Sequence, residues 1–333
     1  MHRVLLFKLM FLSGMVKLLS QDEVWFDLSA LDYHYWTQPI PHALSYWAHN
    51  LPLSIHQLSC AIMFVIELIL PFGFFGPRRV RRFVFLAQVL FQVAIIATGN
   101  YGFFNFLTIA LCLLILDDGQ LPRRSSLALP SISSKNILLQ RPIATLLCGF
   151  IMVIHLSITA QSVLPPSTWS DRAAVPAEWV RPLRLFHSYG LFANMTEKRP
   201  EIIMEGSMDG KTWTRYEFAF KPDSPVDMPP FINPYMPRLD WQMWFAALRG
   251  SCTRSRWYLQ FSKRLLQNEP SVTALLAENP FPQQPPRYLK SQLYQYQFDH
   301  TSKDSRIWWK TTLIADFCPT LQLVGERLQP VNP

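Results

Sequence analysis

A single carboxylate lies inside a long apolar run of this sequence and is the first residue with chemical potential. Glu67 is the one charged residue between Leu58 and Gly76. An unpaired carboxylate in hydrocarbon is costly, so such a residue must find a partner or take up a proton, and it marks a candidate functional site. Gln88 and Gln92, on one helical face of the next apolar run, are the expected partners. Structural packing explains this polar group more simply than transport or catalysis.

Four histidines within one segment raise the question of a metal site: His34, His42, His49 and His56. The last three recur every seven residues, so on a helix they would stand roughly 10 Å apart along its axis, too far to bind one ion. The segment holds no H-x-x-x-H spacing and no cysteine. We therefore expect no metal ion and no cofactor. The chain also lacks a G-x-S-x-G serine elbow, so a lipase activity of its own is not expected.

The aromatic residues near position 240 could either pack in the chain's own core or bind another protein. Trp241, Trp244 and Phe245 are spaced as i, i+3 and i+4, which places them on one helical face. Core packing is the simpler interpretation, and binding of a client's apolar surface is the alternative. Asp240 is the expected N-cap of this helix, with Arg238 as its ion-pair partner.

Covalent modification is suggested at two places. Asn194 begins an N-x-T glycosylation sequon, which matters only in a secretory compartment. Cys252 and Cys318 are the two cysteines outside the apolar runs. They are candidates for a disulfide, but the sequence does not set their separation in space, so both the paired and the free forms stay open.

The composition favours a membrane protein. Of the 333 residues, 50% are hydrophobic and only 16% are charged, against roughly 25% charged in soluble domains. A helix needs about 20 apolar residues to cross a bilayer. Lys8 and Lys17 interrupt the first run, which we interpret as a span whose lysines snorkel or face a bundle interior rather than as a signal peptide. The expected spans are residues 4–19, 58–76, 83–98, 103–116 and 143–164.

The distribution of basic residues predicts the topology, because Lys and Arg in short loops stay cytoplasmic. The turn between the second and third runs contains Arg78, Arg79, Arg81 and Arg82, whereas residues 21–56 contain no Lys or Arg. The turn is therefore expected in the cytoplasm, and everything after the fifth run in the lumen. The net charge of +8 is explained by these flanking bases, so nucleic acid is not an expected partner.

The predicted fold class is a multi-pass helical membrane region, residues 1–164, followed by a mainly β luminal domain, residues 165–333. Asp209-Gly210 is a strong hairpin signal within residues 201–220. The simplest packing is β-sandwich-like, with helices inserted to give an α+β domain. Further strands are expected at 183–192, 287–298 and 306–314. Helices are expected at 240–248, 256–266 and 271–277.

Several uncommon strings occur along nearly the whole chain. They are LDYHY and TQP within 31–39, FGPRR at 75–79, GNY at 99–101, LDD at 116–118, EGS and DG within 205–210, PRLDWQMWFAAL at 237–248 and NPF at 279–281. In this order they resemble the lipase maturation factor family, and the string at 237–248 looks like its hallmark.

The resemblance implies a multi-pass, chaperone-like protein of the endoplasmic reticulum membrane that helps secreted dimeric lipases to fold, assemble and leave. The implied partners are secreted lipases and the lipid bilayer. Members of the family are longer and carry further membrane segments before the position of Met1, so a short form is expected here. Two alternatives stay open. One is a membrane enzyme related to the vitamin K-dependent γ-carboxylase, by fold analogy, and the other is a luminal module that binds glycans or lipids.

Overall fold

The computed structural model describes residues 2–117, 134–163, 190–300 and 306–331, together with residues 178, 180 and 182. The chain forms two compact units. The helical unit contains Met1–Leu31, Leu53–Ala94 and Asn105–Met195. The β-rich unit contains Asp32–Pro52, Ile95–Phe104 and Thr196–Pro333. The predicted division at residue 165 falls among residues outside the described part, so it stays a prediction.

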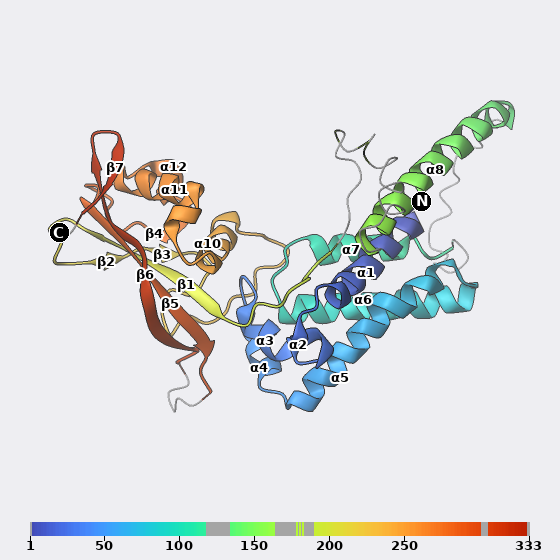
Figure 1. Cartoon of the computed structure of the whole chain (residues 1–333), viewed down its shortest axis with the longest axis horizontal. Helices are drawn as coiled ribbons and strands as arrows, with labels where there is room; N and C mark the ends of the chain where they lie inside the picture. Colours follow the sequence, from blue (N-terminus) through green and yellow to red (C-terminus); the bar gives the residue numbers. More distant parts are fainter. Residues whose placement is uncertain are drawn as a thin grey trace, which may run out of the picture. The chain divides into compact units, whose positions relative to one another are not determined.

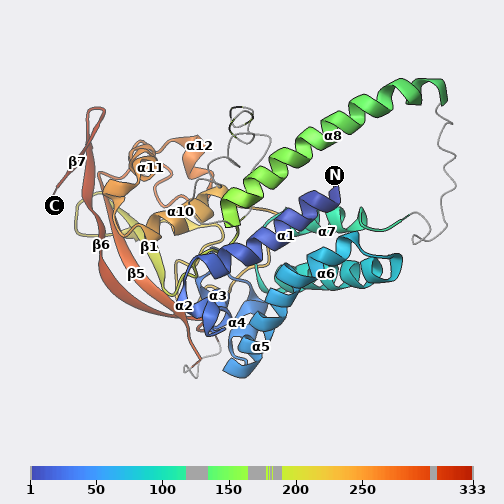
Figure 2. The ribbon, with the colours of Figure 1, turned by 45° about the vertical axis from the view of Figure 1, so that its right-hand side comes forward.

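The helical unit is built from long apolar helices. It contains α1 (His2–Leu19), α2 (Glu23–Phe26), α5 (Leu53–Phe64), the π-helix η1 (Val65–Ile69), the 3-10 helix η2 (Leu70–Phe75), most of α6 (Arg78–Thr98) and α7 (Phe104–Leu113), and α8 (Ser134–Val163). Helix α1 runs beside η1, η2 and α8 (Figures 1 and 2).

Two stretches of the described residues are long and apolar enough to cross a membrane: Leu53–Phe75 and Arg78–Thr98. They correspond to the second and third predicted spans. Phe104–Leu113 and Thr145–Gln161 are shorter apolar helices, so a crossing by them, and by α1, stays a prediction. Large apolar side chains are exposed along the two long stretches, as expected where a helix faces lipid tails. They include Leu58, Ile62, Ile69, Phe72, Phe83, Leu86 and Leu90.

The β-rich unit contains one five-stranded antiparallel sheet in the order β2-β1-β5-β6-β7. Its strands are β1 (Arg199–Ser207), β2 (Thr214–Arg215), β5 (Tyr288–Phe298), β6 (Trp309–Val324) and β7 (Arg327–Pro330). The predicted hairpin around Asp209-Gly210 is confirmed, because Glu205 pairs with Arg215. The predicted strand 183–192 lies largely outside the described residues, and its last three residues are not in a strand.

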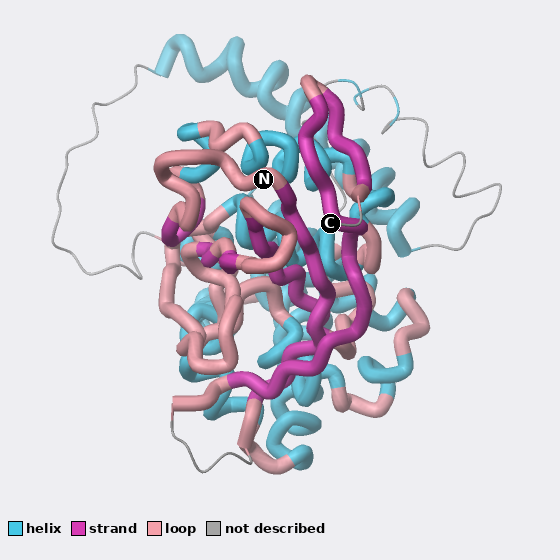
Figure 3. The backbone as a smooth tube through the Cα atoms, turned by 90° about the vertical axis from the view of Figure 1, so that its left-hand side faces the viewer, coloured by secondary structure: helices cyan, strands magenta, loops and turns pink. Residues whose placement is uncertain are grey.

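Helices, not a second large sheet, cover one face of this sheet (Figure 3). They are α10 (Arg238–Leu248), η5 (Cys252–Arg254) and α11 (Arg256–Leu266). Beside them, β3 (Glu217–Phe218) and β4 (Leu276–Glu278) form a two-stranded ribbon. The prediction of an α+β unit is therefore right and its sandwich-like packing is wrong. The predicted helix 271–277 is also shorter, since α12 (Pro270–Thr273) ends before β4 begins.

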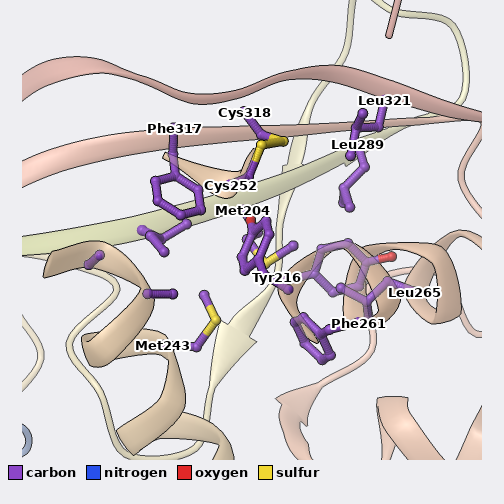
Figure 4. Packing of buried hydrophobic residues seen from close by; sticks show 14 of the residues in the cluster. Met204, Tyr216, Met243, Cys252, Phe261, Leu265, Leu289, Phe317, Cys318 and Leu321 are labelled. Carbon is purple, nitrogen blue, oxygen red and sulfur yellow. A yellow bond between two sulfur atoms is a disulfide. The ribbon is translucent and has the colours of Figure 1, made fainter. Parts of the chain in front are cut away.

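The main core fills the space between the sheet and α10 and α11. Figure 4 shows Met204 of β1 and Phe317 of β6 on the sheet side, facing Met243 of α10 and Phe261 of α11. These buried side chains belong to one hydrophobic cluster, and burying each large one stabilises the fold by roughly 1.5–3 kcal/mol.

The opposite face of the sheet carries a second cluster. Ile203 alternates with Ile202 and Met204 along β1 and packs with Trp36 instead of with the main core, as the two-residue period of a strand requires. Trp36 lies on α3 (Ala30–Thr37), which precedes α4 (Ala43–His49). The segment 32–52 is thereby part of the β-rich unit although residues before and after it belong to the helical unit.

Candidate functional site

Three segments far apart in the sequence meet inside the β-rich unit, and asparagine side chains join them. The Asn100 amide nitrogen donates to the carbonyls of Ile40, Pro41 and Pro230, at 3.3, 3.3 and 2.8 Å. Its carbonyl accepts from the Ile232 amide at 3.0 Å. Since Asn100 is buried, these bonds satisfy both ends of a polar group that would otherwise destabilise the interior.

A second asparagine extends this connection. Asn233 donates to the carbonyls of Ile96 and Gly99, at 3.3 and 2.7 Å. Further along the same segment, a Cβ at Gly102 would lie only 2.9 Å from Met236. Gly102 also has a φ of 63°, in the left-handed region that favours glycine. Residues 230–236 thus pack against the turn between α6 and α7.

The aromatic residues of α10 contact two of the neighbouring segments, at Thr37 and at Tyr101. Trp244 is buried and donates from Nε1 to the Thr37 carbonyl at 3.0 Å. The half-buried Trp241 lies edge-on to Tyr101, with ring centroids 6.3 Å apart, and the Tyr101 hydroxyl lies 3.2 Å from His34 Nε2. Burial raises the pKa of the Tyr101 hydroxyl, so it stays protonated and able to donate. The predicted core role is therefore right for Trp244.

A buried arginine fixes the segment 36–39 to the sheet. Arg199, at the start of β1, donates to the carbonyls of Trp36 and Pro39, at 3.1 and 3.0 Å, and to that of Gln38. Its Nη2 also lies 2.6 Å from Glu201 Oε1, with both side chains fully buried. The five N–H groups of Arg199 can serve these four acceptors at once, whereas a lysine has only three N–H groups.

This arginine belongs to a larger buried network of charges. Lys221 Nζ lies 3.9 Å from Glu201 Oε2 and forms an ion pair with Asp223. Asp223 also accepts from the Phe218 amide at 2.7 Å. Lys221 and Asp223 border a cavity of about 250 Å³. Burial raises the pKa of the Asp223 carboxyl to about 6, although Lys221 favours the charged form.

The predicted role of Asp240 as the N-cap of α10 is wrong. Helix α10 begins at Arg238 after Pro237, so Asp240 lies within its first turn. Asp240 is buried and its Oδ1 accepts from the amides of Phe220 and Lys221, both at 2.9 Å. Burial raises its pKa and these amides oppose the rise. Arg238, its expected partner, is exposed, so Asp240 positions the loop after β3 and does not form the predicted pair.

Large apolar side chains of residues 228–245 face outward. We define the 228–245 apolar surface as Met228, Phe231, Tyr235, Met236 and Phe245, which are exposed by 59, 60, 59, 45 and 45%. Phe231 packs edge-on against His42, with ring centroids 4.8 Å apart. Tyr235 and Met236 also border a cavity of about 610 Å³ that Trp257, Leu275 and Arg238 help to line. Exposed aromatic and Met side chains of this kind are typical of protein-binding surfaces.

The polar residues of the predicted spans pair differently from the prediction. Glu67 Oε2 accepts from Lys17 Nζ at 2.6 Å, and both side chains are buried. Gln88 instead donates to the Ile66 carbonyl at 2.9 Å. Gln92 accepts from Asn105 at 2.8 Å. Lys17 therefore faces the interior of the helical unit, which is one of the two orientations expected for the lysines in α1, and supplies the partner that Glu67 requires.

The Glu67 pair depends on a close approach of α1 to the π-helix η1. A Cβ at Gly14 would lie 2.7 Å from Leu68 and 3.1 Å from the Glu67 Cβ. Glycine permits helices to come this near in an apolar environment. A short π-helical turn inside an apolar helix often marks a functional position, and here it presents the carboxylate to Lys17.

The histidines of the segment 34–56 do not converge. His42 Nδ1 accepts from the Leu44 amide and caps α4, while His49 packs beside His300 with ring centroids 5.2 Å apart. His56 is buried in α5. Within the described residues, no group of three or more His, Cys, Asp or Glu side chains is arranged to hold a metal ion.

The two candidate covalent sites lie in different surroundings. Asn194 is exposed in a bend that precedes β1. Cys252 and Cys318 form a disulfide that joins η5 to β6 inside the main core (Figure 4).

Comparison with known proteins agrees with this arrangement. A profile of the "Lipase maturation factor transmembrane domain" matches residues 1–123, and one of the "Lipase maturation factor C-terminal domain" matches residues 185–319. The chain belongs to the lipase maturation factor family. It is thus a membrane protein with a transmembrane domain.

Individual relatives bear the same family name. "Lipase maturation factor 2" of Rattus norvegicus is 35% identical over 98% of this chain, and that of Homo sapiens is 33% identical over 98%. "Lipase maturation factor 1" of Mus musculus is 32% identical over 96%. The chain spans about 60% of the length of these relatives. No solved structure matches the chain.

Sequence reasoning missed the buried charges and the apolar surface. Arg199 and Glu201 are two residues apart in a strand, and that spacing alone predicts that both lie on one face. The segment 226–236 combines prolines with bulky apolar residues. Bulky apolar residues are unusual in a solvated loop and prolines restrict the backbone, so the sequence indicates a fixed segment but not that its side chains are exposed.

Proposed function

We propose that the chain assists the maturation of secreted lipases from the endoplasmic reticulum membrane, with its β-rich unit in the lumen. Family membership supports the role. The observation that carries it is the 228–245 apolar surface, because large exposed apolar patches on soluble surfaces are typical of binding sites for other proteins.

The mechanism is binding without catalysis. A lipase that has not reached its final assembly exposes apolar surface, which promotes aggregation. Transient contact with Phe231, Tyr235 and Met236 would cover that surface until dimer assembly buries it, after which the enzyme is exported. Asn100 and Asn233 hold the segment that presents these residues, so the surface is prepared in advance and binding costs little ordering of the chain.

Secreted lipase activity tests the proposal. The chain is expressed in cells that lack their own maturation factors, and the activity of a co-expressed secreted lipase is compared with its amount. We expect a higher activity per molecule than with an empty vector. Equal specific activity, with the chain stably inserted in the membrane, would contradict the proposal.

Substitutions in the apolar surface identify the residues responsible. Tyr235→Ser with Met236→Ser removes two exposed apolar side chains and should lower the rescue severalfold without changing the amount of the chain. Val324→Ser is the matched control, because Val324 is exposed by 48% in β6 and lies outside the surface. Equal loss in both variants would show that the surface has no specific role.

The proposed topology has five crossings, with residues 21–56 and the region after residue 165 in the lumen. The exposed Asn194 reports on it. We expect glycosidase treatment to increase the mobility of the chain on a gel, and Asn194→Gln to abolish that change. The opposite topology would be indicated if Asn194 carried no glycan while a sequon introduced in the turn at residues 78–82 were glycosylated.

A further inference from the structure

The beginning of α6 carries four arginines within five residues, and a neighbouring carboxylate neutralises only some of them. Arg81 forms an ion pair with Asp117, and Arg78 Nε lies 3.2 Å from the same carboxylate. Arg3 Nη2 lies 3.4 Å from its other oxygen. Asp117 thus already serves three guanidinium groups, so its single negative charge faces three positive ones.

The other two arginines at this end of α6 have no anionic partner. Arg79 and Arg82 are exposed, and neither side chain forms a hydrogen bond or an ion pair in the part of the chain that the structure describes. The helix dipole disfavours positive charge at the N-terminus of a helix. These two arginines therefore do not stabilise α6 by themselves, and an anion beside them would offset an unfavourable interaction.

Arg79 and Arg82 lie on the outward, apolar face of α6. Residues three and four apart share a face of an α-helix, so the two arginines are in line with Phe83, Leu86 and Leu90. These apolar side chains are exposed by 63, 54 and 58%. The buried residues of α6 belong to a different face of the helix: Val84, Gln88 and Gln92. The two arginines thus continue the stripe of α6 that faces the lipid tails.

The length of α6 places these guanidinium groups at the level of the lipid head groups. The helix has 21 residues, which rise about 31 Å, and the hydrocarbon core of a bilayer is about 30 Å thick. The first turn of α6 is therefore at the boundary of the bilayer, where arginine side chains extend to the head groups. A phospholipid whose acyl chains lie along Phe83 and Leu86 would have its phosphate beside Arg79 and Arg82.

We infer that Arg79 and Arg82 bind the head group of an anionic phospholipid, whose acyl chains pack along the exposed apolar residues of α6. A guanidinium group forms paired hydrogen bonds with phosphate oxygens, and two uncompensated positive charges favour a lipid with a net negative charge over a neutral one. An acidic segment of another protein could pair with the arginines but would not fill the apolar stripe within the hydrocarbon. The inference goes beyond the proposed function and does not depend on it.

The leaflet follows from the proposed topology. If the turn at residues 78–82 is cytoplasmic, the bound lipid belongs to the cytoplasmic leaflet, where anionic lipids produce a negative surface potential. Binding itself can be measured without this assignment, because detergent-solubilised protein exposes both ends of the helix.

Native mass spectrometry of the purified full chain in detergent tests the inference. The chain is incubated with equal amounts of phosphatidylserine and phosphatidylcholine that have the same acyl chains, and the two adducts with one bound lipid are compared. We expect at least fivefold more phosphatidylserine adduct, since one basic residue near a membrane surface typically favours an anionic lipid by about that factor. Equal amounts of the two adducts would overturn the inference and leave these arginines with a role in topology only.

A soluble head group distinguishes a lipid site from a site for any phosphate. Glycerophosphoserine has the same head group as phosphatidylserine and no acyl chains. We expect a tenfold excess of it to leave the phosphatidylserine adduct unchanged, because the apolar stripe contributes to binding. Displacement of the lipid would show that only the anion is bound, and would overturn the inference.

Substitutions locate the site. Arg79→Gln with Arg82→Gln should bring the ratio of the two adducts close to one without lowering the thermal midpoint, because both side chains are exposed and unpaired. The matched control is Arg254→Gln with Arg256→Gln, which also removes two exposed arginines, from the β-rich unit. It should keep the ratio of the unmodified chain.

Equal loss of the preference in both double variants would show a general attraction to positive charge and would overturn the inference. If the double variant at residues 79 and 82 is not recovered in folded form, the single variants Arg79→Gln and Arg82→Gln replace it. Each should lower the ratio at least twofold, and an unchanged ratio in both would overturn the inference.

Discussion

Lys17 Nζ donates a hydrogen bond to Glu67 Oε2 at 2.6 Å, within the apolar interior of the helical unit. Each residue alone would be costly there, and each compensates the other. Lys17 also lies 5.4 Å from the ring centroid of Trp25. The lysine that interrupts the apolar run of α1 is thus a structural element that joins α1 to η1.

Removal of one partner should be more harmful than removal of both. Glu67→Leu leaves a buried ammonium unpaired, and Lys17→Met leaves a buried carboxylate, at an expected cost of about 3–5 kcal/mol in either case. The double variant leaves no uncompensated charge. We expect it to be more stable than either single variant in thermal unfolding of the detergent-solubilised chain. Additive losses would show that the pair is not coupled.

The bond from Trp244 to Thr37 provides a second test. Trp244→Phe keeps a ring in the core but leaves the Thr37 carbonyl without its donor, so we expect a loss of about 1–3 kcal/mol. Trp241→Phe is the control, since Trp241 Nε1 has no hydrogen-bond partner within the described residues. Its removal should leave stability nearly unchanged. Limited proteolysis within residues 38–52 should detect loosening in the first variant only.

Local signals in the sequence were sufficient for several elements. The predicted helix 256–266 has the bounds of α11, because its apolar and basic residues alternate with the helical period. The hairpin could be predicted from Asp209-Gly210, because its tight turn requires a positive φ and Gly210 has a φ of 75°. In both cases neighbouring residues alone determine the backbone.

Pairings between distant residues could not be predicted in the same way. Helical periodicity placed Gln88 and Gln92 on one face, but it does not say which helix packs beside η1, and Lys17 lies 50 residues from Glu67. The sequence likewise does not show what Asp240 contacts, so Asp240 was predicted to cap its own helix. Its actual partners, the amides of Phe220 and Lys221, come from a loop about 20 residues earlier. The sandwich prediction failed because strand patterns show which face is apolar but not whether helices or strands cover it.

The disulfide between Cys252 and Cys318 should contribute measurably to stability. It closes a sequence separation of 66 residues, and loss of a bond of this kind costs roughly 2–5 kcal/mol. Cys252→Ala should therefore lower the thermal midpoint and leave Cys318 open to alkylation, detected by mass spectrometry. Cys148→Ala is the control, because Cys148 is exposed and unpaired. Equal alkylation of Cys318 before and after reduction of the unmodified chain would contradict the pairing.

The buried carboxyl of Asp223 predicts a specific pH dependence of stability. Burial raises its pKa to about 6 in the folded chain, against about 3.9 in an unfolded one. The folded state therefore binds this proton more tightly, and the contribution of Asp223 to stability is full below about pH 4 and is lost as the pH rises through about 6. Asp223→Asn cannot titrate, so its stability should lack this component.

The measurement compares thermal unfolding of the unmodified chain and Asp223→Asn between pH 4 and pH 7.5. The asparagine also changes the surroundings of Lys221, so the absolute stabilities of the two chains are not compared. The informative quantity is the change with pH of the difference between the two chains. We expect this difference to shrink by on the order of 2–3 kcal/mol as the pH rises. Parallel stability curves would show that Asp223 titrates at the same pH in the folded and unfolded chains.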